Sequence, residues 1–216
     1  RDGLIQVVNH GGDKHLGGKL IDWAIVDEIL VPAVTRENRF PDFRRDNPKW
    51  LAAIGKLKQE SEKAKIRLSG SETTEIIIEN LCPNGRGGFV HFEYELKRSD
   101  VEKLAEPFFL RTVNICKKVL SEKRLDAKNM ERIILVGGPT NMPYLRDRLA
   151  DNIHGGLGIP LEFRVDPLTV VARGAAIFAG TQRIKAPSAH RLRENQLSLE
   201  LDYKPISPET EPLVGG

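Results

Sequence analysis

The stretch Ile133-Ile134-Leu135-Val136-Gly137-Gly138-Pro139-Thr140-Asn141-Met142-Pro143 decides how this sequence is interpreted. Its first four residues are apolar and mostly β-branched, which predicts a fully buried strand. Two glycines follow, and residues 144–149 have helical character. This order brings backbone N–H groups close to a bound nucleotide, because glycine lacks Cβ and a helix start leaves free donors. On its own, the pattern is more typical of an ordinary tight turn between a strand and a helix.

The composition is that of a soluble globular protein, with 40% hydrophobic and 29% charged residues in a chain of 216. The net charge of +3 is too small to indicate nucleic acid as a partner, and the aromatic residues are few. No apolar run approaches the roughly 20 residues that span a bilayer. Cys82 and Cys116 lack metal-ligand spacing and indicate free thiols in a reducing compartment. Because the chain starts with Arg1 rather than Met, we expect an internal boundary of a longer protein there.

A second unit of the same kind precedes the first along the chain. Residues 4–10 have the pattern of a strand, residues 11–18 are a glycine-rich turn, and residues 19–31 have the spacing of an amphipathic helix. Pro32 is expected to end or kink that helix. Two such units suggest two sides of one cleft. The apolar stripe of the helix comprises Leu20, Trp23, Val26 and Leu30.

Residues 50–69 predict a strong helix that carries three polar side chains on one side. At about 100° per residue, Glu62, Lys65 and Ser69 lie together beside the apolar stripe. A carboxylate accepts hydrogen bonds, an ammonium donates them and a hydroxyl does both, so the trio suits ribose hydroxyls and a base edge. The residues alone favour the alternative of a surface helix with an (i, i+3) ion pair. The stripe comprises Ile54, Leu57, Ala64 and Leu68.

Between these units the pattern predicts a hairpin and a long helix, after a polar loop at residues 35–49. Residues 74–81 and 89–96 alternate as strands, with turn residues between them. Ser99 and Glu102 have capping-box spacing and are expected to open a helix as far as about residue 121. Pro107 is expected to bend or split it. The inner side of this helix is expected to comprise Val101, Leu104, Phe108, Ile115 and Val119.

The last third of the chain predicts a short strand, a helix and a tail. Residues 161–165 have the pattern of a strand, and Asp166-Pro167 is a typical helix start that leads to about residue 183. Residues 185–216 are basic and then proline-rich. We interpret them as a linker and the start of a further C-terminal domain.

Four segments together resemble one family, the DnaK-type, seventy-kilodalton heat-shock chaperones. Residues 12–18 are similar to the turn that enters the outer subdomain of the second lobe of the family's ATPase domain. Residues 62–69 resemble its adenosine-contacting helix, and residues 133–145 its adenosine signature. Residues 166–176 resemble its closing helix. The order and spacing agree over about residues 5–183.

The resemblance implies an α/β fold, half of an actin-like (ribonuclease H-like) ATPase domain with an inserted helical and β-hairpin subdomain. Residues 1–16 and 105–184 would form the inner subdomain of the lobe, with a sheet and helices. Residues 17–104 would form the outer subdomain.

The resemblance also implies a nucleotide site, with no catalytic residue and no metal ligand in this chain. Gly17 and Gly18 would lie near the phosphates, and Glu62 and Lys65 would hold the ribose. Ser69 would contact the adenine edge, and Gly137 and Gly138 would present backbone near the ribose and α-phosphate. Asn141 would stand beside the base.

Three positions depart from the family's pattern. Asn141 stands where the family usually has an arginine packed against adenine, and an amide cannot supply that planar cationic surface. Pro139 replaces a commonly polar residue, and Leu168 replaces an aspartate. Residues 196–202 keep the family's leucine-rich interdomain linker only in part. These departures mark a divergent member of the family.

By resemblance, the full-length protein would be a cytoplasmic stress-response chaperone that couples ATP binding and hydrolysis to the binding and release of unfolded polypeptides. It would use ATP or ADP with Mg²⁺, a J-domain co-chaperone and a nucleotide-exchange factor, but neither nucleic acid nor a membrane. The first lobe and both phosphate loops of the family are absent from this sequence. We therefore expect these 216 residues alone not to hydrolyse ATP.

Two other interpretations remain open. One is another actin-like ATPase, either a sugar kinase or a filament protein, which residues 12–18 and 62–69 argue against. The other is a non-catalytic relative that binds partners and has a decayed nucleotide site at Pro139, Asn141 and Leu168.

Overall fold

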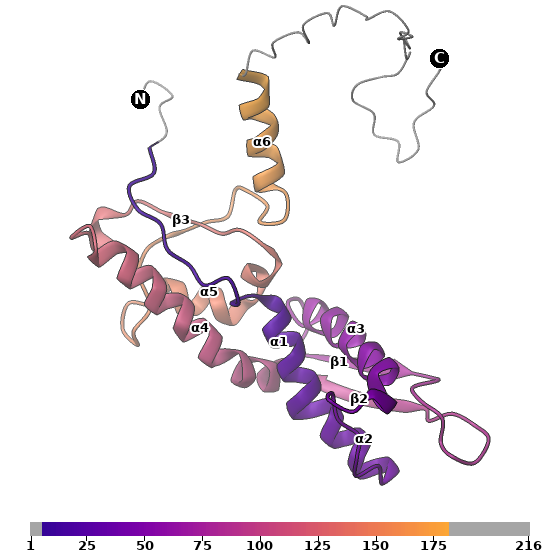
Figure 1. Cartoon of the computed structure of the whole chain (residues 1–216). Coiled ribbons are helices and arrows are strands. Elements are labelled where there is room, and N and C mark those ends of the chain that lie inside the picture. Colours follow the sequence, from indigo (N-terminus) through magenta and orange to yellow (C-terminus); the bar gives the residue numbers. More distant parts are fainter. Residues whose placement is uncertain (1–5, 182–216) are drawn as a thin grey trace, which may run out of the picture. The chain divides into compact units, whose positions relative to one another are not determined.

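The computed structural model describes residues 6–181 (Figure 1). The chain divides into two compact units, residues 1–174 and 175–216, which are described separately. The described part of the first unit, residues 6–174, is mixed α/β and contains two separate two-stranded sheets. The described part of the second unit is the end of a single helix, α6 (Val170–Thr181), which begins in the first unit.

A continuous helical run follows the first glycine-rich turn. It consists of α1 (Gly18–Ile25), the π-helical turn η1 (Val26–Leu30) and α2 (Val31–Asn38). Pro32 was predicted to end or kink this helix, but helical structure continues through it to Asn38. Val31 N–H donates to the carbonyl of Val26 five residues back, so the ladder is already widened where Pro32 lacks an N–H. The buried residues of the run are Ile21, Asp22, Ile25, Val26, Leu30, Ala33 and Val34.

The helix predicted for residues 50–69 is confirmed as α3 (Leu51–Arg67), which packs against α1. The 3-10 turn η2 (Pro48–Trp50) leads into it. The loop predicted for residues 35–49 is confirmed only over residues 39–47, because α2 continues to Asn38 and η2 begins at Pro48. This irregular loop has an aromatic core. The rings of Phe40 and Phe43 lie 5.0 and 5.1 Å from the ring of Trp50 and fix the start of α3. All four residues of the predicted stripe are buried: Ile54, Leu57, Ala64 and Leu68.

The predicted hairpin is formed by β1 (Thr73–Ile78) and β2 (Phe92–Lys97). The strands pair antiparallel, with Ile78 opposite Phe92. In the long turn between them, the side-chain oxygen of Asn84 accepts hydrogen bonds from two backbone N–H groups at 2.8 and 3.1 Å. The hairpin packs one face against α3, where its buried residues are Ile76, Ile78, Phe92 and Leu96.

The long helix α4 (Arg98–Ser121) differs from the prediction in its start and its buried face. The expected capping box is not formed, because β2 leads directly into the helix and Ser99 already lies inside the first turn. Pro107 does not split α4. Pro107 has no N–H to donate to the carbonyl of Lys103. Both residues are on the exposed side of the helix, where water can donate to that carbonyl instead. The buried residues are Val101, Ala105, Phe109 and Val113, whereas Leu104, Phe108, Ile115 and Val119 are half-buried.

The stretch around Ile133 forms a shorter strand than predicted. β3 (Ile133–Ile134) pairs in parallel with β4 (Leu161–Glu162). The prediction of a fully buried strand is wrong, since Ile134 and Val136 are 61% and 49% exposed and only Leu135 is fully buried. Among the described residues, β3 has β4 as its one paired neighbour, so alternate side chains face solvent. The 3-10 turn η4 (Gly138–Asn141) and α5 (Pro143–Ala150) then complete the predicted order of strand, glycines and helix.

The strand predicted for residues 4–10 is not formed over residues 6–10, which have no regular secondary structure. Val7 and Val8 are exposed, and the side-chain amide of Asn9 donates to the carbonyl of Val119 at 2.8 Å. This segment is therefore held by α4 and not by a neighbouring strand. The first two residues of the predicted strand lie outside the described residues.

The capping of the last helix by Asp166 is confirmed in part. Its carboxylate accepts hydrogen bonds from Leu168 N–H at 3.0 Å and the Thr169 hydroxyl at 2.9 Å. Regular helix begins only at Val170, after this turn. The helix end expected near residue 183 and the linker expected at residues 185–216 lie outside the described residues.

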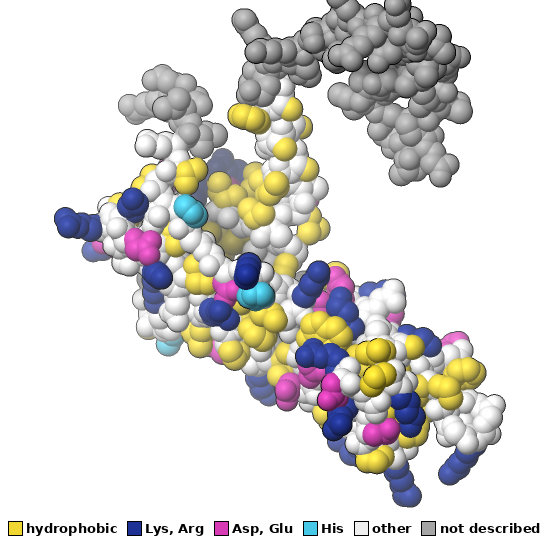
Figure 2. Space-filling view, viewed as in Figure 1, with side chains coloured by type: hydrophobic (Ala, Val, Ile, Leu, Met, Phe, Trp, Pro, Cys, Tyr) yellow, Lys and Arg dark blue, Asp and Glu magenta, His cyan; other side chains and the backbone are white. Residues whose placement is uncertain are grey.

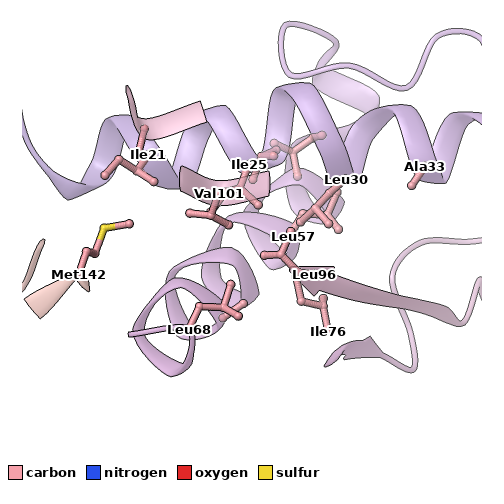
Figure 3. Close-up of a cluster of buried hydrophobic side chains, with 14 of the residues drawn as sticks. Ile21, Ile25, Leu30, Ala33, Leu57, Leu68, Ile76, Leu96, Val101 and Met142 are labelled. Atoms are coloured by element: carbon pink, nitrogen blue, oxygen red, sulfur yellow. The ribbon is translucent and has the colours of Figure 1, made fainter. Parts of the chain in front are cut away.

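One apolar core joins α1, α3, the hairpin and α4, and side chains from each converge in Figure 3. Met142, which directly follows η4, belongs to this core, so the core includes a residue next to the second glycine turn. On the face shown in Figure 2, basic side chains are interspersed with acidic ones. Among residues 6–181, no helix is both long and apolar enough to cross a bilayer.

Candidate nucleoside-binding site

A cavity of about 540 Å³ lies where α1, the second half of α3 and the turn η4 meet. Its volume is in the range of small-molecule sites. Six of the eight predicted site residues line it: Gly18, Glu62, Lys65, Ser69, Gly138 and Asn141. The structure therefore brings together three segments that are distant in sequence. The other lining residues are Lys19, Asp22, Ile66, Pro139, Met142 and Leu168.

The two remaining predicted residues lie outside this lining. Gly17 lines a neighbouring cavity of about 460 Å³, on the other side of Gly18 and Pro139. Gly137 lines neither cavity and has a conformational role. Its φ of 90° favours glycine, and its N–H donates to the carbonyl of Pro167 at 2.9 Å.

Glu62 presents an ionised carboxylate at the mouth of the cavity. Its side chain is half exposed and pairs with Lys58 one turn earlier, at 3.2 Å. The hydrogen bond and charge of Lys58 lower the pKa of Glu62, with smaller contributions from Lys65 and Lys19. Glu62 is therefore an acceptor at neutral pH. The alternative of a Glu62–Lys65 ion pair is not what forms, because each residue has a different partner.

Lys65 is a buried cation in the wall of the cavity. Its ammonium lies 2.5 Å from Asp22 Oδ1 and 3.3 Å from the carbonyl of Gly18. An ammonium has three N–H donors, so these contacts leave one N–H for a ligand. Asp22 is itself 1% exposed, and its Oδ2 has no hydrogen-bond partner. The pair therefore holds the ammonium at a fixed position between α1 and α3.

Gly18 is the point at which the three segments come closest. A Cβ at this position would lie 2.9 Å from Pro139 Cγ and 3.0 Å from Lys65 Nζ. Both distances are too short for ordinary packing, so a side chain at residue 18 would separate α1 from η4 and α3. The absence of a Cβ is therefore required here by packing.

The turn of the second glycine pair is held by its own hydrogen bonds. The hydroxyl of Thr140 donates to the carbonyl of Gly137 at 2.7 Å, and Met142 N–H donates to the carbonyl of Pro139 at 3.1 Å. Gly138 is exposed at the rim of the cavity. These hydrogen bonds define the conformation of the turn without a ligand, and a preformed turn favours binding because less conformational entropy is lost.

Helix α5 is attached to α4 by a polar network behind the turn. Glu106 accepts hydrogen bonds from the Tyr144 hydroxyl and from the Arg148 guanidinium, the latter at 2.5 Å. Burial alone would raise the pKa of Glu106, but these two donors outweigh it and lower the pKa. The ionised carboxylate thus fixes α5, and with it the turn that α5 follows.

Sequence reasoning missed Asp22 and Ile66. Asp22 had a signal, because it is the acidic residue on the side of the 18–30 helix that also carries Ile21 and Ile25. An acid on an apolar face requires a buried partner. Ile66 gave no signal, because an exposed apolar residue on a helix is common. Only the position of Leu168 opposite α3 shows that Ile66 lies in a cavity wall.

The cavity offers polar groups of several kinds to a ligand. Its lining contains the carboxylates of Glu62 and Asp22 and the ammonium groups of Lys65 and Lys19. A hydroxyl at Ser69 and an amide at Asn141 are the neutral polar side chains, and the rest of the lining is apolar or glycine. Within residues 6–181, no group of three or more His, Cys, Asp and Glu side chains is placed to hold a metal ion. The pattern of polar groups among apolar walls is typical of a site that orients a small organic ligand.

Fold and site together define a mixed α/β protein with a ligand-sized cavity between two glycine turns and a helix. The family model described as Hsp70 protein matches residues 1–207. The chain belongs to the Hsp70 family and is thus a relative of the Hsp70/DnaK chaperones.

Individual relatives agree with the family match. The chain is 35% identical, over 215 residues, to the mitochondrial-type heat shock protein 70 of Encephalitozoon hellem, covering 100% of this chain and 33% of that protein. It is 37% identical, over 175 residues, to the chaperone protein DnaK of Picrophilus torridus, covering 81% of this chain and 27% of that protein. The DnaK of Thermoplasma acidophilum is 35% identical over 176 residues, 82% of this chain and 27% of that protein. The chain thus spans a third or less of the length of these relatives.

Proposed function

We propose that the cavity is the nucleoside half of an ATP site, in the second lobe of an Hsp70-type ATPase domain. The observation that carries this proposal is the convergence on one cavity of Gly18, residues 62–69 from the end of α3 and the turn after it, and the Gly138–Asn141 turn. The family relationship supplies the ligand class, and the geometry supplies a compatible pocket.

In this proposal the polar groups divide between the parts of a nucleotide. Glu62 accepts hydrogen bonds from ribose hydroxyls, and the free N–H of Lys65 donates to a ribose oxygen. Ser69 and Asn141 meet the base. Gly18 and Gly138 leave space for the ribose and phosphates beside the backbone, because neither has a side chain. ATP or ADP, with Mg²⁺ in the full-length protein, is the proposed ligand.

We further propose the domain arrangement implied by the family. Residues 1–16 and 105–184 belong to the inner subdomain of an actin-like lobe, and residues 17–104 to its outer subdomain. The packing of α1, α3 and the β1–β2 hairpin around one core supports the second assignment. Residues 185–216 are proposed to lead into a further domain.

For the full-length protein, we propose a cytoplasmic chaperone in which ATP binding and hydrolysis control the binding and release of unfolded polypeptides. A J-domain co-chaperone and a nucleotide-exchange factor are the proposed partners. The support for this statement is membership of the Hsp70 family.

The proposal is tested by titrating ADP into the 216-residue chain and following backbone amide signals by NMR. Glu62→Gln removes a charged acceptor from the cavity and is expected to weaken ADP binding about tenfold. Glu60→Gln is the matched control. Glu60 lies on the same helix and pairs with Lys63, but it does not line the cavity. This control is expected to bind ADP as the wild type does.

The same titration has two outcomes that contradict the proposal. No saturable change up to about 10 mM ADP, which would mean a binding free energy weaker than about −3 kcal/mol, favours a relative that binds partners without a nucleotide. Equal effects of Glu60→Gln and Glu62→Gln would place any bound nucleotide outside this cavity.

A further inference from the structure

Asn141 at the rim of the cavity is held by Arg146, one turn into α5. The Arg146 guanidinium donates from Nη2 to Asn141 Oδ1 at 2.7 Å and from Nε to the carbonyl of Thr140 at 2.7 Å. A face of the guanidinium lies over the ring of Phe163, 5.3 Å from the centroid. Two hydrogen bonds to adjacent residues of the η4 turn and one ring contact thus fix the guanidinium.

This contact decides which end of the Asn141 amide is available to a ligand. Arginine is a donor only, so it binds the oxygen of the amide and not the NH₂ group. The reverse orientation would place two donors against each other. The Asn141 oxygen therefore already accepts one hydrogen bond from Arg146, and the side chain that lines the cavity has its two N–H donors to offer.

The surroundings of Asn141 make this donor significant. Ile66, Met142 and Leu168 form apolar walls of the same cavity, and Ser69 supplies its other neutral polar group. A planar base would rest against these apolar side chains, which do not distinguish one base from another. Hydrogen bonds from the few neutral polar groups are then the available means of discrimination.

We propose that Asn141 reads the base of the bound nucleotide by donating its amide N–H to an unprotonated ring nitrogen of a purine. Arg146 is the positioning residue that keeps the N–H directed into the cavity. This inference rests on the proposed nucleotide site and adds to it the residue pair that determines base preference.

The test compares ADP with its 1-deaza, 3-deaza and 7-deaza analogues, each of which replaces one ring nitrogen by carbon. One of the three is expected to bind the wild-type chain about 3- to 10-fold more weakly than ADP, because it lacks the acceptor. The difference is expected to disappear in Asn141→Asp, which keeps the shape of the side chain and the contact with Arg146 but has no N–H. Asn114→Asp, an exposed change on α4 outside the cavity, is expected to keep the difference.

The positioning role of Arg146 has its own readout. Arg146→Met is expected to reduce the preference for ADP over the discriminated analogue to less than about twofold, whereas Arg146→Lys, which can still donate to the Asn141 oxygen, keeps part of it. A purely structural role would weaken ADP and the analogue equally and leave their ratio unchanged.

The outcomes separate this inference from the proposed function. If ADP and all three analogues bind within twofold of one another, or if the difference persists in Asn141→Asp, the cavity binds nucleotides but Asn141 does not read the base. If no nucleotide binds at all, both the proposed function and this inference fail.

Discussion

The buried pair of Lys65 and Asp22 gives the sharpest test of how the cavity is built. Lys65→Met keeps the length and most of the volume of the side chain but removes its charge. Because Asp22 Oδ2 already lacks a partner, the substitution leaves both oxygens of a buried carboxylate unpaired. The two side chains are 9% and 1% exposed, so water cannot replace the lost ammonium without local opening.

The expected loss is large. Removing one member of a buried ion pair typically lowers the free energy of unfolding by about 3–5 kcal/mol. With a urea m-value of about 2 kcal/mol/M, this corresponds to a midpoint shift of about 1.5–2.5 M. The double variant Asp22→Leu/Lys65→Met removes both charges together and is expected to recover most of the loss, since apolar replacements of a buried pair are often neutral.

Urea unfolding of the 216-residue chain, followed by circular dichroism, measures these shifts. Lys58→Met is the matched control, because Lys58 lies on the same helix and pairs with Glu62 at the surface. It is expected to cost less than about 1 kcal/mol. A loss of stability in Lys65→Met no larger than in Lys58→Met, or a double variant less stable than Lys65→Met alone, would contradict a buried ion pair at this position.

Three further predictions concern packing and pH. Gly18→Ala is expected to lower stability by about 1–3 kcal/mol and to weaken ADP binding, because its Cβ meets neighbours at 2.9 and 3.0 Å. Gly12 lies in the same glycine-rich turn, and a Cβ there would meet nothing within 4 Å, so Gly12→Ala is expected to change neither stability nor ADP binding. Equal melting temperatures for Gly12→Ala and Gly18→Ala would contradict the close packing at Gly18. Leu57→Ala, at a fully buried position, is expected to cost about 2–5 kcal/mol in urea unfolding, whereas Ile66→Ala, which is 63% exposed, is expected to stay within about 0.5 kcal/mol. The two hydrogen-bond donors of Glu106 lower its folded-state pKa below the unfolded value near 4.3. The stabilisation of the fold by the Glu106 carboxylate is therefore present above that pH and is lost as the pH falls through the lower folded pKa. Stability curves of the wild type and Glu106→Gln are therefore expected to differ at pH 7 and to converge in acid; a gap that is constant with pH would show that the carboxylate charge is not involved.

The local sequence pattern predicted the elements whose hydrogen bonds join residues close together in the sequence. The helix of residues 50–69, the hairpin and the order of strand, glycines and helix after Ile133 all follow from side-chain period and turn residues. Periodicity failed where pairing with another segment decides the result. Val7 and Val8 read as strand residues, but no strand forms around them in the described part of the chain.

The sequence by itself determined the Hsp70 resemblance and the position of Glu62 and Lys65 on one side of α3, because helical spacing is a local property of the backbone. Ser69, the third residue of the predicted trio, lies beyond the end of α3. Only the tertiary structure decided that Lys65 pairs with Asp22 and not with Glu62, and that Arg146 donates to the amide oxygen of Asn141. These partners lie on different elements or turns, so their distances depend on how the elements pack. The spacing of residues along the chain does not specify how the elements pack. The close approach of three segments at Gly18 exists only in the folded structure.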